Sequence, residues 1–354
     1  MGTGEVSDCF ALTTRAAADA GRIGFAHIEG LFMKICIVGA GAIGGYLAVK
    51  LGQAGAEMTL IARGPHLEAI RANGLTLEGR DGSRATIRPA LATPDMAEAG
   101  PQDAVVVAVK AQSLPAMAAP MRALYGPETM VIYAQNGLPW WYFMRHGGEH
   151  DGRRIEAVDP GGVIAEHTEV ERVIGCVVYP AATISAPGVI RHIEGDRFSL
   201  GELDGSKSER LSRFAALLSA SGVKAPVKPN IRTEIWIKLW GNLSMNPISA
   251  LTRATLDVIC GDALTRALAA AMMAEAQQIG ERLGIDFGLS IQKRISWAEA
   301  IGAHKTSMLQ DIEAGRPTEI DAILGAVIEL GRMVSLPTPH LSAMYACVRQ
   351  LERH

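Results

Sequence analysis

Short apolar runs alternate with helical patterns along the first part of the chain. The runs cover residues 35–38, 58–62, 104–109 and 130–134, while residues 43–51 and 113–124 carry apolar side chains at helical spacing. A short apolar run between turn residues is typical of a strand that is buried on both faces, as strands are in a parallel sheet. The alternation therefore predicts an α/β fold with a doubly wound parallel sheet.

A second group of strands is expected after a polar, glycine-rich segment at residues 145–171, which we interpret as a long loop or an insertion. Residues 173–179, 189–193 and 197–200 have the apolar pattern of strands, and the turn sequence Ala-Pro-Gly lies at 186–188. We expect these strands to form an antiparallel meander appended to the sheet, followed by a helix over residues 209–221.

From residue 231 onward the pattern is helical, with predicted helices at 231–251, 263–283, 289–300, 319–334 and 339–351. Pro226 and Pro229 mark a short linker before them. The chain is therefore expected to divide into an α/β domain over residues 33–228 and an all-helical domain over residues 229–354. The ligand cleft should lie between the carboxyl ends of the strands and the helical domain.

Residues 1–32 do not share this organisation. They lack the basic segment followed by an apolar segment that a secretory signal requires, and Met33 stands directly before the first predicted strand. We interpret residues 1–32 as a disordered or non-native N-terminal extension and Met33 as the more natural start.

Composition narrows the class of protein. The 354 residues suggest about two domains, and the contents of 48% hydrophobic and 20% charged residues are ordinary for a globular protein. A net charge of -3 predicts no nucleic-acid partner, and no apolar stretch is long enough to predict a membrane span. Five scattered cysteines suggest a reducing cytoplasm. His146 and His150 have glycines between them and no third ligand nearby, so no metal site is predicted.

A glycine-rich turn at residues 39–44 joins the first predicted strand to the first predicted helix. Gly39 permits the tight turn, Gly41 lets the backbone approach a pyrophosphate, and Gly44 lets the helix pack close to the strand. The helix N-terminus, with Ala42 and Ile43, offers N–H donors to the anion. The order of strand, turn and helix predicts a Rossmann-like dinucleotide-binding domain.

Arg63 stands at the end of the second predicted strand, where dinucleotide sites that bind NAD or FAD carry an acidic residue for the ribose hydroxyls. A guanidinium at this position can pair with a 2′-phosphate instead, which favours NADP as the cofactor. The alternative is a solvated surface arginine.

The helical half contains one polar stripe in apolar surroundings. Lys238, Asn242 and Asn246 are spaced at i, i+4 and i+8, which places them on one side of a helix that Pro247 is expected to kink or interrupt. A lysine flanked by apolar residues and aligned with amides suits a proton donor in a cleft. The alternative is a solvent-facing polar stripe of an amphipathic helix.

A second polar cluster covers residues 305–321, where one helix is expected to end near Gly315 and another to begin at Pro317. Glu319 and Asp321 stand where acidic groups interact favourably with a helix dipole, so they can be explained as ordinary helix-start residues or as part of a site.

Several of these motifs, in this order, resemble the ketopantoate reductase (2-dehydropantoate 2-reductase) family from about Met33 to the C-terminus. The residues that carry the resemblance are Gly39 to Gly45, Ala62-Arg63-Gly64, Val109-Lys110-Ala111, Gln135-Asn136-Gly137, the stripe Lys238, Asn242 and Asn246, Ser307 to Asp311, and Glu319-Ile320-Asp321.

The resemblance implies an NADPH-dependent enzyme that reduces 2-dehydropantoate to pantoate in pantothenate biosynthesis. It implies Lys238 as general acid, Glu319 as its partner or a substrate-hydroxyl ligand, and Ser307 as a contact to the substrate carboxylate. It further implies Asn242 and Asn246 as ligands of the lysine or the substrate. Lys110 and Asn136 would lie at the cofactor and nicotinamide edge, and Asn136 would also contact the substrate.

The chain departs from shorter family members at Trp140-Trp141-Tyr142 and at residues 145–171, which we interpret as an elaboration near the cleft. Aromatic bulk there could reshape the acyl pocket, so reduction of another 2-oxo acid or of an imine stays open. A non-catalytic NADP-binding protein is a third alternative, which Lys238 and Glu319 disfavour. We expect a cytoplasmic protein without membrane or nucleic-acid partners that can form a homodimer.

Overall fold

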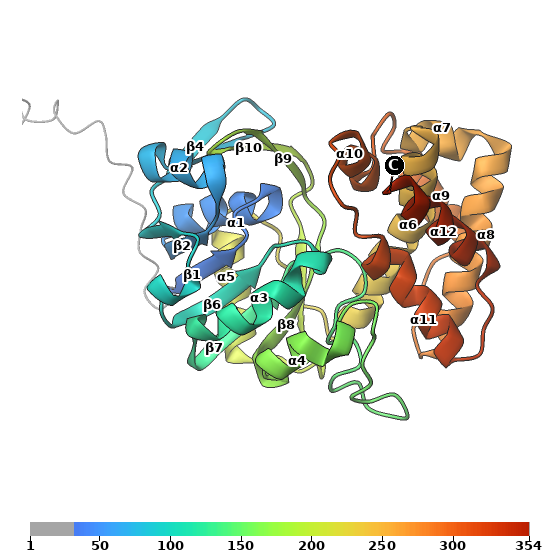
Figure 1. Ribbon diagram of the computed structural model, residues 1–354, viewed down its shortest axis with the longest axis horizontal. Helices are drawn as coiled ribbons and strands as arrows, with labels where there is room; N and C mark the ends of the chain where they lie inside the picture. Colours follow the sequence, from blue (N-terminus) through green and yellow to red (C-terminus); the bar gives the residue numbers. More distant parts are fainter. Residues whose placement is uncertain (1–31, 354) are drawn as a thin grey trace, which may run out of the picture.

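The computed structural model describes residues 32–353, which form an α/β half and a helical half that lie side by side (Figure 1). The expected N-terminal extension lies, apart from Phe32, outside the described residues. Every regular element between residues 231 and 353 is a helix, as the sequence predicts.

The main sheet has seven strands in the order β11-β8-β7-β6-β1-β2-β5. All neighbours pair in parallel except β11, which runs antiparallel to β8. The doubly wound parallel sheet is therefore confirmed. Its strands are β1 (Lys34–Val38), β2 (Glu57–Ile61), β5 (Leu91–Thr93), β6 (Gln102–Val107), β7 (Tyr125–Tyr133), β8 (Val173–Val178) and β11 (Phe198–Glu202).

Helices cover both faces of this sheet, which explains the apolar runs. Ile35 and Ile37 of β1 belong to the core beneath α1 (Ala42–Gln53) and α5 (Glu209–Ala220). Cys36 and Val38 belong to the core beneath α3 (Leu114–Met121) and α4 (Val163–His167). Because successive side chains of a strand point to opposite faces, both faces must be apolar. The helix α2 (Gly64–Asn73) follows β2.

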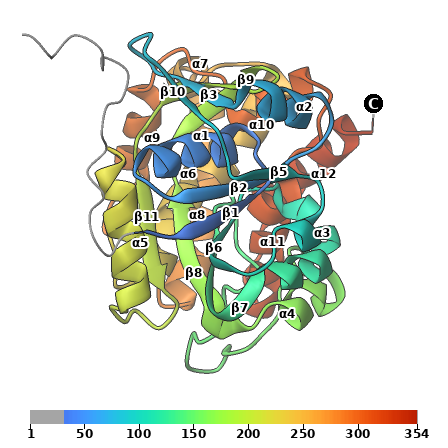
Figure 2. The same cartoon turned by 90° about the vertical axis from the view of Figure 1, so that its left-hand side faces the viewer.

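A second, smaller sheet packs on the other side of α1, so that α1 lies between the two sheets (Figure 2). Its order is β4-β3-β10-β9, with β3 (Leu75–Glu78), β4 (Arg84–Ile87), β9 (Ala181–Ala186) and β10 (Val189–Glu194). The close approach depends on Gly45, since a Cβ there would lie 2.7 Å from Ile190 Cγ1.

The prediction of one continuous meander was wrong in its pairing. The turn at residues 186–188 does join two antiparallel strands, but β9 and β10 leave the main sheet and β10 pairs in parallel with β3. The sequence did not predict β3, β4, β5 or β9, because β4 is exposed at alternate positions, β5 has only three residues and half of β9 is exposed.

In the helical half, α6 packs against α8, α10 and α12. Trp236 and Trp240 of α6 are fully buried. The elements are α6 (Ile231–Thr252), α7 (Leu256–Gly261), α8 (Ala263–Arg282), α9 (Ile291–Glu299), α10 (Ser307–Glu313), the π-helical turn η6 (Asp321–Gly325), α11 (Ala326–Met333) and α12 (Pro339–Leu351).

Two local predictions in this half need correction. Pro247 does not interrupt α6, which continues to Thr252, because buried neighbours such as Met245 and Ile248 hold the helix although proline donates no backbone hydrogen bond. Pro317 does not begin a helix. It lies in the irregular segment before η6, where its carbonyl accepts hydrogen bonds from Lys110 and Gln112.

Residues 145–171 form a long, largely irregular segment, as expected, which includes the short helix α4 near its end. Of the aromatic residues before them, Tyr142 is buried in the core, where its hydroxyl accepts a hydrogen bond from Trp236 Nε1. Among residues 32–353, no helix is long and apolar enough to cross a membrane.

Candidate active site

The three glycines of the turn after β1 have three different surroundings. Gly39 has a φ of +95°, and a Cβ there would lie 2.6 Å from Val109 Cγ1. A Cβ at Gly44 would collide with the carbonyl oxygen of Gly39, so the absence of a side chain lets α1 pack against the turn. At Gly41 nothing lies within 4 Å of the Cβ position. The backbone is therefore open to a ligand at Gly41 only, as a pyrophosphate-binding turn requires.

The charges at the N-terminus of α1 and near the end of β2 also suit the phosphates of a dinucleotide. The first turn of α1, which begins at Ala42, contains no acidic residue, so the helix dipole is free to attract an anion. Arg63 lies two residues after the end of β2, is exposed, and has no ion-pair partner within residues 32–353. Its guanidinium is thus available to a phosphate.

Lys110 connects the two halves of the molecule. Its ammonium group lies 2.6 Å from Asp311 Oδ2 and donates to the carbonyl of Pro317 at 2.7 Å. Both partners belong to the helical half, so in this structure Lys110 holds the halves together. Lys110 directly follows Val109, which packs against Gly39 of the glycine turn, and its positive charge acts on the Glu319 carboxylate.

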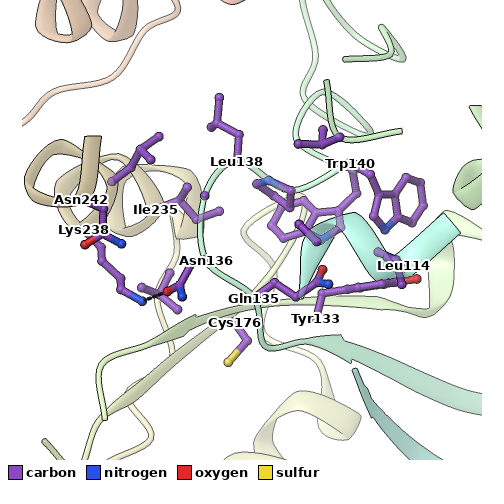
Figure 3. Close-up of a pocket in the computed structure, with 17 residues that line it drawn as sticks. Leu114, Tyr133, Gln135, Asn136, Leu138, Trp140, Cys176, Ile235, Lys238 and Asn242 are labelled. Atoms are coloured by element: carbon purple, nitrogen blue, oxygen red, sulfur yellow. Dashed lines mark hydrogen bonds between the residues drawn. The ribbon is translucent and has the colours of Figure 1, made fainter. Parts of the chain in front are cut away.

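A hydrogen-bonded chain of three side chains crosses the cleft between the halves. Lys238 Nζ donates to Asn136 Oδ1 at 2.5 Å, and Asn136 Nδ2 donates to Glu319 Oε2 at 2.9 Å. The backbone N–H of Ala111 reaches the other carboxylate oxygen at 3.4 Å. Figure 3 shows Lys238 extending from α6 to the amide of Asn136, which lies in the loop after β7. Because its oxygen accepts and its nitrogen donates, the amide is fixed in one orientation.

Burial shifts the pKa of both ionisable groups in this chain. It lowers the pKa of Lys238 from 10.5 to about 8, although the negative charge of Glu319 opposes the shift. It raises the pKa of Glu319, although the hydrogen bond from Asn136 opposes that change. A lysine that exchanges its proton near neutral pH is suited to act as a general acid.

Lys238 and Asn242 lie at the junction of two cavities. One, of about 270 Å³, opens between α6, α9, α10 and the start of β9. The other, of only about 20 Å³, is bordered by Trp140 and Trp141 (Figure 3). The aromatic elaboration is therefore buried beside the candidate proton donor. The larger cavity is lined by Ile43, Asn136, Lys238, Asn242, Asn246 and Ser307, among others.

The structure thus brings together the residues of the polar stripe, Ser307, Asn136 and, through hydrogen bonds, Glu319. Asn246 is 5% exposed, and its Nδ2 has no hydrogen-bond partner. Because a buried donor without an acceptor is costly, this amide favours a ligand with an acceptor group in the cavity.

The sequence did not point to Arg294, Tyr179, Glu194 or His304, which also line the larger cavity. Arg294 follows Lys293 in a helix with several polar positions, so nothing in its pattern distinguishes it from a solvated arginine. Among residues 32–353, no group of three His, Cys, Asp or Glu side chains is placed to hold a metal ion.

A dinucleotide-binding half that faces a helical half across a cleft with a half-buried lysine has the architecture of a pyridine-nucleotide-dependent oxidoreductase. Comparison with known proteins identifies the family. The model of "Ketopantoate reductase PanE/ApbA" matches residues 35–205, and that of its C-terminal part matches residues 230–352.

Individual relatives agree with the family models. The 2-dehydropantoate 2-reductase of Mesorhizobium japonicum is 55% identical over 90% of this chain and 98% of its own. A crystal structure of a proposed ketopantoate reductase from Ralstonia solanacearum is 44% identical, with a TM-score of 0.86 over 91% of this chain and 98% of that chain. D-mandelate dehydrogenase, solved with NADH and anilino(oxo)acetate, shares the fold at 24% identity and a TM-score of 0.77, covering 91% of this chain and 98% of that one.

The chain belongs to the ketopantoate reductase family, whose members are pyridine-nucleotide-dependent oxidoreductases.

Proposed function

We propose that this protein is an NADPH-dependent 2-dehydropantoate 2-reductase, which reduces 2-dehydropantoate (ketopantoate) to pantoate. Family membership and the relative at 55% identity support this activity. The observation that carries the proposal is the hydrogen-bonded chain Lys238–Asn136–Glu319 beside a polar cavity. In the dinucleotide-binding half, the backbone at Gly41 is open to a ligand. Residues 33–228 would bind the nucleotide, and residues 229–354 would supply most of the substrate site.

Lys238 is the proton donor in this proposal. A bound nicotinamide supplies the hydride for the carbonyl carbon of the substrate. The ammonium group stabilises the negative charge that develops on the carbonyl oxygen and then transfers its proton to it. With its pKa lowered to about 8, Lys238 is protonated at neutral pH and releases its proton more readily than an exposed lysine.

Asn136 and Glu319 orient this donor. The amide of Asn136 holds the ammonium group at 2.5 Å and is itself held by the Glu319 carboxylate. Glu319 is also proposed as a ligand of a substrate hydroxyl. Asn242, Asn246 and Ser307 are proposed as substrate ligands because they line the same cavity.

The exposed, unpaired Arg63 favours NADPH over NADH, since its guanidinium can pair with the 2′-phosphate. A cytoplasmic location and a homodimer are further parts of the proposal. Light scattering on the purified protein tests the homodimer.

The activity is tested by incubating purified protein and NADPH with ketopantoate, pyruvate, phenylpyruvate and benzoylformate in parallel. We expect ketopantoate to give the highest kcat/KM. A higher value for another 2-oxo acid would assign that substrate instead. Oxidation of NADPH no faster than in protein-free controls, with every acid tested, would refute a reductase of this class.

A further inference from the structure

Arg294 of α9 lies against α6 beside the candidate proton donor. Its guanidinium occupies the space that a side chain at position 241 would need, because a Cβ at Gly241 would collide with Nη2 of Arg294. Gly241 is the residue before Asn242, and both line the larger cavity together with Arg294. The glycine in this helix therefore lets the guanidinium reach the cavity wall.

The charge of Arg294 has no counter-ion among the described residues, 32–353. In that part of the chain its one hydrogen bond runs from Nε to the carbonyl of Ile237, at 3.4 Å, and uses one of five N–H donors. No carboxylate within residues 32–353 forms an ion pair with it, although fifteen pairs of a lysine or arginine with a carboxylate exist elsewhere in that part of the chain. The side chain is nevertheless partly buried, and burial lowers the pKa of its guanidinium.

A guanidinium that is withdrawn from water without a carboxylate partner is costly, and an anion in the cavity would offset that cost. Other charged groups at the cavity do not compensate it. Glu194 lies near His304, with 3.8 Å between Oε1 and Nδ1. Lys238 is itself a cation and adds positive charge to the same cavity. The cavity thus contains a planar, five-donor cation whose free N–H groups match the two oxygens of a carboxylate.

We propose that Arg294 binds the carboxylate of the 2-oxo acid substrate, and that Gly241 is the residue that gives it access. This inference rests on the proposed function and goes beyond it by naming the residue that separates 2-oxo acids from uncharged ketones. Lys238 then donates its proton to the carbonyl oxygen of the substrate, and Arg294 binds the carboxylate.

The kinetic test compares a 2-oxo acid with its uncharged methyl ester at saturating NADPH. Arg294→Met should lower kcat/KM for the acid by roughly ten- to a hundredfold, mainly through KM, and should leave the ester nearly unchanged. The preference for acid over ester should narrow accordingly. Lys293→Met removes the same charge from the exposed neighbouring position of α9 and should leave the preference as it is.

Two further variants separate the role of the guanidinium from a merely structural one. Arg294→Lys keeps the charge but loses the planar fork, so it should retain part of the preference. Gly241→Ala keeps the arginine, but the added methyl group displaces its guanidinium, so this variant should also raise KM for the acid. An unchanged preference for acid over ester in Arg294→Met and Gly241→Ala would overturn the inference.

A binding experiment makes the inference independent of turnover. Oxalate, titrated calorimetrically into the protein with NADP, should bind the unaltered protein and Lys293→Met alike, and Arg294→Met at least about tenfold more weakly. If no 2-oxo acid were reduced but oxalate still bound through Arg294, the proposed function would fail, and Arg294 would stand as a carboxylate-binding residue only. Equal oxalate affinity in Arg294→Met, or no oxalate binding to the unaltered protein, would overturn it.

Discussion

Replacing Lys238 with methionine should separate catalysis from stability. The substitution keeps most of the side-chain volume and removes the proton that we assign to the substrate oxygen. Loss of a positioned general acid lowers rates by about a hundred- to ten-thousandfold, which corresponds to roughly 3–5 kcal/mol of transition-state stabilisation. Binding of NADPH should change little, because the glycine turn and Arg63 belong to the other half of the molecule.

The same substitution should not unfold the protein. A pKa of about 8 in place of 10.5 means that folding makes the ammonium form of Lys238 less favourable by roughly 3 kcal/mol. Methionine removes this cost but leaves Asn136 Oδ1 without its donor, a loss of about 1–3 kcal/mol. The two effects nearly cancel, so the free energy of unfolding at pH 7 should stay the same or rise by up to about 2 kcal/mol.

The pH dependence of this stability difference follows from the lowered pKa. The cost of burying the ammonium is fully present below about pH 8 and vanishes as the pH passes 10.5, where the unfolded chain has lost the proton too. The gain in the free energy of unfolding that Lys238→Met shows over the unaltered protein should therefore be smallest at high pH. Urea unfolding at pH 7 and pH 10 measures the difference, with the exposed Lys207→Met as control. Near-normal kcat in Lys238→Met would refute the assignment and return the stripe to a structural role.

Three further predictions concern the rest of the site. Asn136→Leu should lower kcat as Lys238→Met does. In the double variant kcat should fall by less than the product of the two single effects, because both residues act through one hydrogen-bonded chain. A double-mutant cycle in kcat measures this. Arg63→Asp should narrow or reverse the preference for NADPH over NADH, whereas Arg80→Asp at an exposed turn should not; equal kcat/KM for both cofactors in the unaltered protein would contradict the proposal. Gly41→Ala should weaken NADPH binding without lowering the melting temperature, whereas Gly44→Ala should cost about 1–3 kcal/mol of stability because its methyl group meets the Gly39 carbonyl. Calorimetric titrations measure the first effect and thermal melts the second. An equal loss of stability in the two variants would contradict the assigned roles.

The parallel sheet could be predicted from the sequence because its strands are buried on both faces. Alternate residues of β1, such as Ile35 and Cys36, enter two different cores, so no polar position interrupts the run. The second sheet gave no such signal. Its strand β4 is exposed at Arg84 and Thr86, and its pairing of β10 with β3 joins segments more than a hundred residues apart. Local patterns do not determine which distant strands pair.

The candidate site was predicted unevenly for a similar reason. Lys238 and Asn242 share one helix, so their spacing alone places them together. The link to Asn136 and Glu319 comes from three separate elements and was suggested only by the family resemblance. Arg294 was missed because its surroundings depend on Gly241 of another helix. The expected role of Lys110 at the cofactor stays a prediction, and its ion pair with Asp311 is a contact between the halves that the sequence did not suggest.

The most direct test of the proposed mechanism is the pH dependence of kcat/KM for ketopantoate reduction by NADPH, measured with the unaltered protein and with Lys238→Met. Because Lys238 must hold its proton to donate it, kcat/KM should be level at neutral pH and fall about tenfold per pH unit above about pH 8. The residual activity of Lys238→Met should lack this decline. A level profile up to pH 10 in the unaltered protein, or the same decline in Lys238→Met, would contradict the assignment of Lys238 as the proton donor.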